Sequence, residues 1–450
     1  MFEHHRVLGG LSHAFRRKRW TWDVGVHAVG DLESRPGRLL GALTPEVIWH
    51  PSGPLGDRFE LPGLRFDWPS DEDALGPGLE AALGQTVDLL PWRRQTLYLQ
   101  DRLLDHLASG VRGRPLQPLN APTTAALLEE LDLPPRARDL LTGRWAYHGL
   151  IPERSSSFAH AMVSRSYARG SHYPEGGAPS LGLALRAAIE AHGGHIELGR
   201  SVTGLGVERS RIQTISVGSE IIEVSSVVAG LGAHRLLGLL PPRWSTHPWA
   251  RALAGLPASV QHVSLFLGLS GDPRPAGAGP WNLWLHNTWR PTRETWDPRD
   301  QARPPASYAS FPSLKDPQHR GGHTASLVAF VPPGLFPPRG TVAYGELKRR
   351  MQAVLLDELL ERLPGLGPLI EHVELGTPAS STRFLASPSA YGLAATPQRY
   401  ACPWLRARTP VHGLVLAGGD LVLGSVLGAV AGGELAALAL DPGLQPIGKP

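Results

Sequence analysis

The spacing of hydrophobic positions changes several times along the chain, and each change predicts a different kind of element. Between residues 79 and 150, apolar side chains recur at helical spacing in three or four segments. Between residues 260 and 333 they alternate with polar ones at a period of two, which is typical of strands. Residues 341–363 return to helical spacing. We therefore predict a helical block, then a sheet, and then one long amphipathic helix that closes this region.

A second group of elements lies outside this region. A helix over 180–192 is followed by a Gly-Gly turn and a strand over 195–198, and a buried strand over 413–420 leads into a helix over 424–440. A helix, a Gly-rich turn and a parallel strand are what a chain needs to extend the sheet of a nucleotide-binding domain. Further strands of this group are predicted at 202–208, 212–217 and 226–230.

The two groups predict an α/β protein with two domains, each built from separate stretches of the chain. The first is a discontinuous, Rossmann-like dinucleotide-binding domain. The second is an α+β substrate-binding domain that combines a mixed sheet with the helical block. The predicted boundaries are 1–50, 173–258 and 370–450 for the first domain, and 51–172 and 259–369 for the second.

Composition narrows the class of function. The 450 residues carry a formal net charge of +4 and one dense basic run, Arg16–Arg19, so no nucleic-acid partner is expected. Cys402 is the only cysteine, which excludes a disulfide within the chain and favours a reducing compartment. The most apolar stretch, 413–440, contains Asp420 and Glu434 and falls short of a membrane span. We expect a cytoplasmic protein without a signal peptide. Peripheral contact with the inner face of the membrane stays open, and no pattern indicates an oligomeric state.

The end of the last predicted strand carries the clearest candidate chemistry. Gly419 and Asp420 lie where ligands of open α/β sheets bind, so the carboxylate can accept hydrogen bonds from a ribose or ribityl hydroxyl. An N-cap for the following helix is the alternative role of Asp420. On that helix, Gly424, Gly428 and Gly432 share one face, where they admit either a flat ligand or a neighbouring backbone.

The first thirty residues are typical of the second half of a dinucleotide site. Glu3 is an acid, the pair Gly9-Gly10 follows it, and Gly25 lies on a short aromatic strand. In a nucleotide-binding βαβ unit such an acid bonds the ribose, and a Gly-rich turn about twenty residues earlier holds the pyrophosphate. That turn would lie before residue 1. A helix-capping turn is the alternative for Gly9-Gly10.

Two residues within the predicted domains are candidates for a catalytic role. His27 follows the aromatic strand, where a lone histidine is either a core residue or a proton donor. Lys315 is one of only four lysines, although Lys315-Asp316-Pro317 is typical of a surface turn, which is what we expect. No metal site is predicted, because glycines 321 and 322 between His319 and His323 disfavour a helix that would bring both to one ion.

Aromatic residues gather in the strand region that we assign to the substrate domain. They line either an apolar groove for a long polyene or the ordinary core of that domain. They are Trp281, Trp284, Trp289, Tyr308 and Phe311.

Several motifs follow one another along nearly the whole chain, and with them the chain resembles the FAD-dependent carotenoid desaturase, carotenoid isomerase and retinol saturase family, the phytoene dehydrogenase-like flavoproteins. The pieces Ser310–Pro317 and Tyr391-Gly-Leu favour the saturase and isomerase members. The matching residues are Glu3 with Arg6–Gly10, His13 and Phe15; Trp22–His27 and Gly30; Tyr173–Ala178; Ser310–Pro317; Tyr391–Pro397; and Gly413–Asp420 with Gly424 and Gly428.

The resemblance implies an amine-oxidase-like fold, FAD in extended form, and an oxidoreductase or isomerase that acts on the C=C or CH–CH bonds of a lipophilic polyene. It leaves NAD(P) open as an electron source. Glu3 would bind the adenosine ribose, Gly9 and Gly10 would pass the pyrophosphate, and Asp420 would hold the ribityl chain. The cofactor-binding candidates are Glu3, Arg6, Gly9, Gly10, Gly25, Gly419, Asp420 and Gly428.

One departure from the family bears on the function. Family members have a strand, a G-x-G-x-x-G turn and a helix before the acid, and Glu3 has only two residues before it. We therefore expect a chain that is N-terminally truncated relative to the family. The alternative function is a flavin-free protein that binds a polyene or assists a pigment pathway. The resemblance names no catalytic residue, and the candidates are His27, Lys315 and Tyr391.

Overall fold

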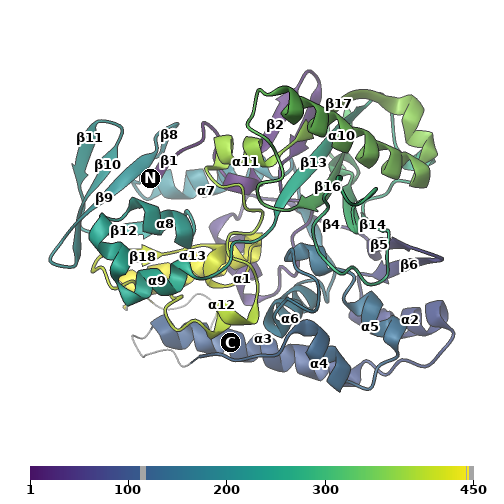
Figure 1. The fold of residues 1–450 in the computed structure, drawn as a ribbon, viewed down its shortest axis with the longest axis horizontal. Helices are drawn as coiled ribbons and strands as arrows, with labels where there is room; N and C mark the ends of the chain where they lie inside the picture. The colour runs from purple at the N-terminus through teal and green to yellow at the C-terminus, as the bar shows by residue number, and fades with distance from the viewer. Residues whose placement is uncertain (112–117, 442, 445–450) are drawn as a thin grey trace.

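The computed structural model describes residues 1–111, 118–441 and 443–444. A seven-stranded mixed sheet lies on one side of the molecule, and a group of shorter strands lies on the other (Figure 1). In the large sheet β14 and β5 are parallel, and all other neighbours are antiparallel. Its order is β17 (Ile370–Gly376), β13 (Gln261–Leu269), β16 (His323–Val331), β15 (Ala306–Ser310), β14 (Asn282–His286), β5 (Leu55–Leu61) and β6 (Leu64–Pro69).

Helices cover both faces of the large sheet. On one face, α10 (Val342–Arg362) packs Leu355 and Leu359 against residues of β13 and β16 such as Leu265. On the other face, Trp284 of β14 belongs to a separate core that includes α2 (Leu75–Leu83) and α5 (Pro135–Leu141). Because neighbouring residues of a strand point to opposite faces, the period-two pattern of the sequence supplies both cores.

The shorter strands include two parallel pairs. The first pairs β1 (Phe2–Glu3) with β8 (Glu197–Leu198), and the second pairs β12 (Val227–Ala229) with β18 (Leu414–Leu416). A three-stranded antiparallel sheet of β9 (Val202–Glu208), β10 (Arg211–Val217) and β11 (Glu220–Glu223) lies beside them. Around these strands lie α7 (Pro179–Ala191), α8 (Ala233–Leu239), α9 (Pro248–Ala254) and α13 (Val426–Leu440). Parallel strands with flanking helices are the Rossmann-like arrangement that the sequence predicts.

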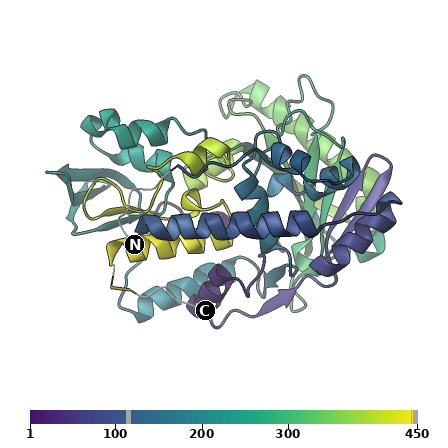
Figure 2. The ribbon, with the colours of Figure 1, turned by 90° about the horizontal axis from the view of Figure 1, so that it is seen from below.

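One long helix connects the two sides. α3 (Leu90–Val111) crosses the middle of the molecule along its long direction (Figure 2), where it contacts α6 (Ser157–Ser166) and α13. α6 is buried along most of its length. Among the helices of the described residues, none combines the length and the apolar character that a membrane crossing requires. The remaining helices are α1 (Arg35–Leu43), α4 (Thr124–Glu130), α11 (Pro378–Leu385) and α12 (Pro397–Ala401).

A hairpin near the N-terminus joins the first strand to the large sheet. It consists of β2 (Ala14–Arg17) and β3 (Trp20–Asp23). The indole N–H of Trp20 donates to the backbone oxygen of Leu269 at 3.0 Å, and that of Trp22 donates to Leu267 at 2.9 Å. The first stretch of the chain is therefore held against β13. Further along the chain, β4 (Trp49–Pro51) pairs with β7 (His172–Pro174).

The structure confirms the predicted α/β class and most of the predicted elements. The helices over 180–192, 341–363 and 424–440 are α7, α10 and α13, each within two residues at its ends. One assignment differs. We expected residues 370–376 to return to the dinucleotide-binding domain, but β17 pairs with β13 at the edge of the large sheet. β13 has nine residues, and its free edge offers backbone N–H and C=O groups to any extended segment nearby. β17 can therefore pair with it even though the next strand, β18, lies in the other group.

Candidate functional site

The turn after β1 presents free backbone amides. Gly9 and Gly10 both have positive φ angles, 109° and 56°, a conformation that glycine adopts without steric cost. Within the described chain, the amides of Gly9, Gly10 and Leu11 have no hydrogen-bond acceptor. A Cβ at Gly10 would meet no atom within 4 Å, so the space above this turn is open. Such a turn can hold an anionic group.

Glu3 lies at the end of β1, at the beginning of the same segment. Its Oε1 accepts a hydrogen bond from the amide of His5 at 2.7 Å, and the side chain is partly exposed. Arg6 is exposed between Glu3 and the glycines, and its stem lies near Gly199. An acid followed by unpaired amides and a cation fits the ribose and pyrophosphate ends of FAD.

Asp420 lies in the short turn that follows β18 and is 6% exposed. Its Oδ2 accepts from the amide of Ala233 at 2.7 Å, and its Oδ1 accepts from the amide of Leu393 at 2.8 Å. Ser425 caps α13 by accepting from the amide of Gly428, so Asp420 is not the N-cap of that helix. The carboxylate instead joins the start of α8 to the loop that contains Tyr391.

The glycines around α13 lie close to neighbouring backbone. A Cβ at Gly428 would be 2.1 Å from the backbone oxygen of Leu423, and one at Gly432 would be 2.1 Å from that of Gly418. At Gly424 it would be 2.7 Å from the Cβ of Tyr391. Close backbone packing therefore accounts for these positions. A Cβ at Gly25 would likewise lie 3.1 Å from the backbone oxygen of Leu11.

Tyr391 reaches from this loop to the helical block. Its hydroxyl donates to the backbone oxygen of Ala146 at 2.9 Å, and its amide donates to Ser259 Oγ at 2.8 Å. Its ring lies 6.0 Å from that of Phe330 on β16. Burial raises the pKa of the Tyr391 hydroxyl. The loop thus connects the end of β18 to an aromatic cluster on the large sheet.

Lys315 follows β15 and is buried, which corrects our expectation of a surface turn. The side chain is 3% exposed. Its Nζ donates to the backbone oxygen of His27 at 2.5 Å, to Ser310 Oγ at 2.9 Å and to Asn282 Oδ1. Desolvation lowers the pKa of Lys315 to about 7, although nearby carboxylates act in the opposite direction. In the described chain no carboxylate oxygen lies within 4.0 Å of this nitrogen.

Behind Lys315 lies a buried carboxylate that the sequence analysis missed. Asp57 of β5 is 1% exposed and pairs with Arg144 at 2.5 Å. It accepts further hydrogen bonds from the Tyr147 hydroxyl at 3.1 Å and the Trp284 indole at 3.0 Å. Asn282 Nδ2 donates to the same oxygen at 3.3 Å, so Asn282 connects Lys315 with this network. Asp57 shares a strand face with buried Phe59, and a polar residue at an inward position was the available signal.

Two further buried polar atoms lack a hydrogen-bond partner within the described residues. They are His27 Nδ1 and the Tyr308 hydroxyl, and their rings lie 4.9 Å apart. Burial, with a smaller contribution from the Lys315 charge, lowers the pKa of His27 to about 3, so its imidazole is neutral at pH 7. Buried polar atoms without partners are rare and mark places where a ligand can bond.

The predicted aromatic groove divides into three places. Trp284 and Tyr308 lie together in the core that includes α2 and α5, with ring centroids 4.7 Å apart. Phe311 belongs to the core under α10, on the other face of the sheet. Trp281 and Trp289 are covered instead by the guanidinium groups of Arg58 and Arg136. For Phe311 the structure therefore favours the alternative of an ordinary core residue.

No family model matches the chain. It is, however, similar over nearly its whole length to all-trans-retinol 13,14-reductases. The protein from Danio rerio is 24% identical over 96% of this chain and 80% of its own length. The one from Homo sapiens is 24% identical over 98% of this chain and 81% of its own length.

A solved structure with the same fold is cyclohexylamine oxidase from Brevibacterium oxydans. It superposes with a TM-score of 0.59 at 16% identity, over 98% of this chain and 93% of that one. These comparisons confirm the resemblance that the motifs indicated and its retinol saturase side. In sequence the chain is similar to the retinol 13,14-reductases, and in fold it is similar to cyclohexylamine oxidase.

Proposed function

We propose that the chain is an FAD-dependent oxidoreductase that acts on a C=C or CH–CH bond of a lipophilic polyene of the retinoid class. The observation that carries this proposal is the match to retinol 13,14-reductases over 96% of the chain. The open turn at Gly9 and Gly10 beside Glu3 supports it, because these groups suit the charged half of the cofactor. Bound FAD would supply the hydride that a double bond takes up, or accept one from a CH–CH bond.

The residues that would hold FAD come from both parallel pairs. Glu3 would bond the ribose, and Arg6 with the amides of Gly9 and Gly10 would bind the pyrophosphate. Gly419 and Asp420 would hold the ribityl chain at the end of β18. Gly25 and Gly428 would contribute to the FAD site indirectly, by allowing the close approach of the Leu11 and Leu423 backbones, which a side chain would prevent.

Three residues stay candidates for direct contact with the substrate. Lys315 is the first, since its side chain is buried, has no carboxylate within 4.0 Å in the described residues, and contacts the backbone of His27. We propose that Lys315 Nζ exchanges its hydrogen bond to Ser310 Oγ for one to the polar end of the polyene, since its three N–H groups otherwise donate to His27, Asn282 and Ser310. His27 and Tyr391 would position this end, His27 through the neutral imidazole and Tyr391 as part of the wall.

A double bond that is saturated takes up two electrons and two protons, so the reaction needs a reductant. We propose a nicotinamide dinucleotide, NAD(P)H, as the source of the hydride that reduces the flavin. We also propose that the protein takes its apolar substrate from a membrane surface by peripheral contact.

The test uses the purified full chain. FAD is added, unbound cofactor is removed by gel filtration, and the visible spectrum of oxidised flavin reports binding. The loaded protein is then incubated without oxygen with all-trans-retinol and a reductant, and the products are separated by chromatography. We expect bound flavin and a product with one double bond fewer.

Matched variants locate the cofactor. Glu3→Gln should weaken FAD binding about tenfold, the effect of losing one charge-assisted hydrogen bond of about 1.4 kcal/mol. The control is Glu46→Gln, which removes an exposed carboxylate that makes no hydrogen bond in the described chain. A protein that retains a coloured lipid but never binds flavin would contradict the proposal and favour the flavin-free polyene-binding alternative.

A further inference from the structure

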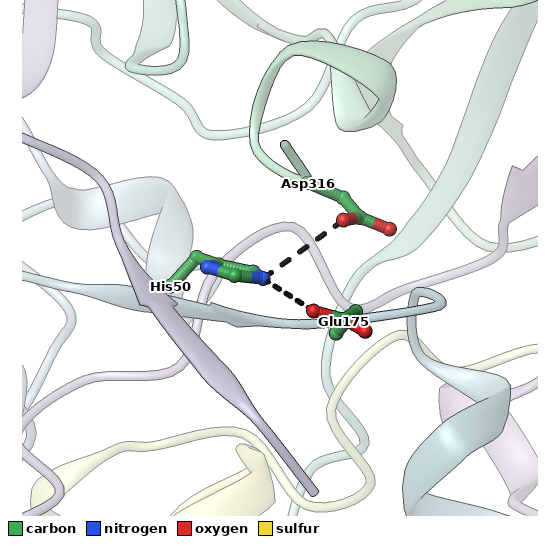
Figure 3. A group of neighbouring side chains, drawn as sticks. All are labelled: His50, Glu175 and Asp316. Carbon is green, nitrogen blue, oxygen red and sulfur yellow. Dashed lines mark hydrogen bonds and ion pairs between the residues drawn. The ribbon is translucent and has the colours of Figure 1, made fainter. Parts of the chain in front are cut away.

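We propose that His50, Glu175 and Asp316 form a binding site for a divalent metal cation. The three side chains come from separate parts of the chain and point toward one another (Figure 3). His50 lies in the middle of β4, Glu175 directly follows β7, and Asp316 lies in the turn after β15. Because 125 residues separate the first two, no sequence spacing indicates the group.

The distances suit shared coordination. His50 Nε2 lies 3.0 Å from Glu175 Oε2 and 4.0 Å from Asp316 Oδ1, and the three ligand atoms all lie within 4.8 Å of one another. Two bonds of about 2.1 Å place ligand atoms at most about 4.2 Å apart. The half-buried Glu175 side chain, which is 34% exposed, can rotate by the small amount that the remaining separation requires.

The lone pairs of Asp316 are only partly used. Its Oδ2 accepts from the amide of Gly176 at 3.0 Å, and its Oδ1 accepts from the amide of Gln318 at 2.8 Å. Each carboxylate oxygen can accept a second interaction. These two backbone bonds also fix the orientation of the carboxylate, in the way that hydrogen bonds from surrounding groups orient metal ligands.

The charges of the group are unbalanced. Two carboxylates face one imidazole, and in the described chain neither carboxylate has a Lys or Arg nitrogen within 4.0 Å. The buried carboxylate Asp57, by comparison, is paired with Arg144 at 2.5 Å. Asp316 is 7% exposed, so water screens its charge weakly. A divalent cation supplies the positive charge that the surrounding residues lack.

The donor set selects the kind of cation. One imidazole nitrogen with two carboxylate oxygens suits Mn²⁺ or Zn²⁺, whereas Mg²⁺ and Ca²⁺ prefer oxygen ligands only. Three protein ligands leave further positions for water. A bound cation would join the β4–β7 pair to the turn that begins at Lys315, and so fix that turn in place.

The test measures metal retention by the full-length protein. The chain is treated with a chelator, dialysed against micromolar Mn²⁺, and analysed for manganese per polypeptide, with Zn²⁺ in a parallel experiment. We expect one ion per chain and a rise in the melting temperature when the ion is restored. Glu175→Gln should weaken Mn²⁺ binding about 10- to 100-fold.

The control is Glu374→Gln, which removes a carboxylate 3.6 Å from another imidazole, that of His372, but one that Arg17 already neutralises. It should leave Mn²⁺ binding unchanged. His50→Gln, a second variant at the site, should weaken binding as Glu175→Gln does. Retention of less than about a tenth of an ion per chain, or equal binding by Glu175→Gln and the parent, would overturn the proposal and leave an ion pair only.

Discussion

The buried carboxyl group of Glu358 gives the protein a pH-dependent stability that can be measured. The residue is 0% exposed in α10, and its Oε1 accepts a hydrogen bond from Asn287 Nδ2 at 2.7 Å. Its Oε2 has no partner in the described part of the chain. Burial raises the pKa of Glu358 from its ordinary 4.5 to about 7. The folded state therefore holds this proton more tightly than the unfolded state does.

The sign of the effect follows from this difference. As the pH rises from about 4.5 to about 7, the unfolded chain releases the proton first, so the free energy of unfolding falls across this range. Glu358→Gln removes the titration. We expect the variant to be up to about 3 kcal/mol more stable than the parent at pH 8, and about equal to it at pH 4.

Urea unfolding at several pH values provides the measurement. Glu346→Gln is the control, because it removes an exposed carboxyl group from the same helix, and its curve should follow that of the parent. If the free energy of unfolding of Glu358→Gln changed with pH in parallel with that of the parent, the buried carboxyl would not titrate as described.

At the scale of elements, α13 contains a matched pair of glycines. A Cβ at Gly432 would lie 2.1 Å from the backbone oxygen of Gly418, whereas one at the neighbouring Gly433 would meet no atom within 4 Å. Gly432→Ala should therefore cost about 1–3 kcal/mol of stability by overpacking. Gly433→Ala should gain up to about 1 kcal/mol from helix propensity. Thermal unfolding measures both, and equal effects would contradict the close contact between α13 and the turn after β18.

Elements with a clear period could be predicted from the sequence, and side-chain contacts between distant elements could not. The patterns over 202–208 and 424–440 correspond to β9 and α13, because the spacing of apolar residues within a short segment is enough to predict a strand or a helix. Lys315 was expected at the surface, since a Lys-Asp-Pro turn carries no sign of the strand and loop that cover it. The same holds for Asp57, whose partner Arg144 is far away in the chain.

At the scale of the whole molecule, the chain passes repeatedly between the two sheet regions. The β2–β3 hairpin is anchored to β13 by Trp22, and β17 returns to the large sheet before the chain ends in β18 and α13. Because segments of each region contact the other region, neither region can unfold without breaking contacts that the other makes.

We accordingly expect one cooperative thermal transition. The calorimetric and van 't Hoff enthalpies should agree, as in a two-state protein. Trp22→Phe, which loses the hydrogen bond to Leu267, should lower the melting temperature and keep a single transition. Differential scanning calorimetry is the measurement, and two resolved transitions would contradict this coupling.

The carboxylate of Asp420 has one more consequence. It holds the loop that carries Tyr391 at one end and the start of α8 at the other, and Tyr391 in turn contacts the helical block through Ala146. A ligand that competed for these oxygens would release the loop, and one that displaced Tyr391 would release the carboxylate. We therefore expect occupancy of the two regions to be linked, in which case each ligand changes the affinity for the other by the same factor.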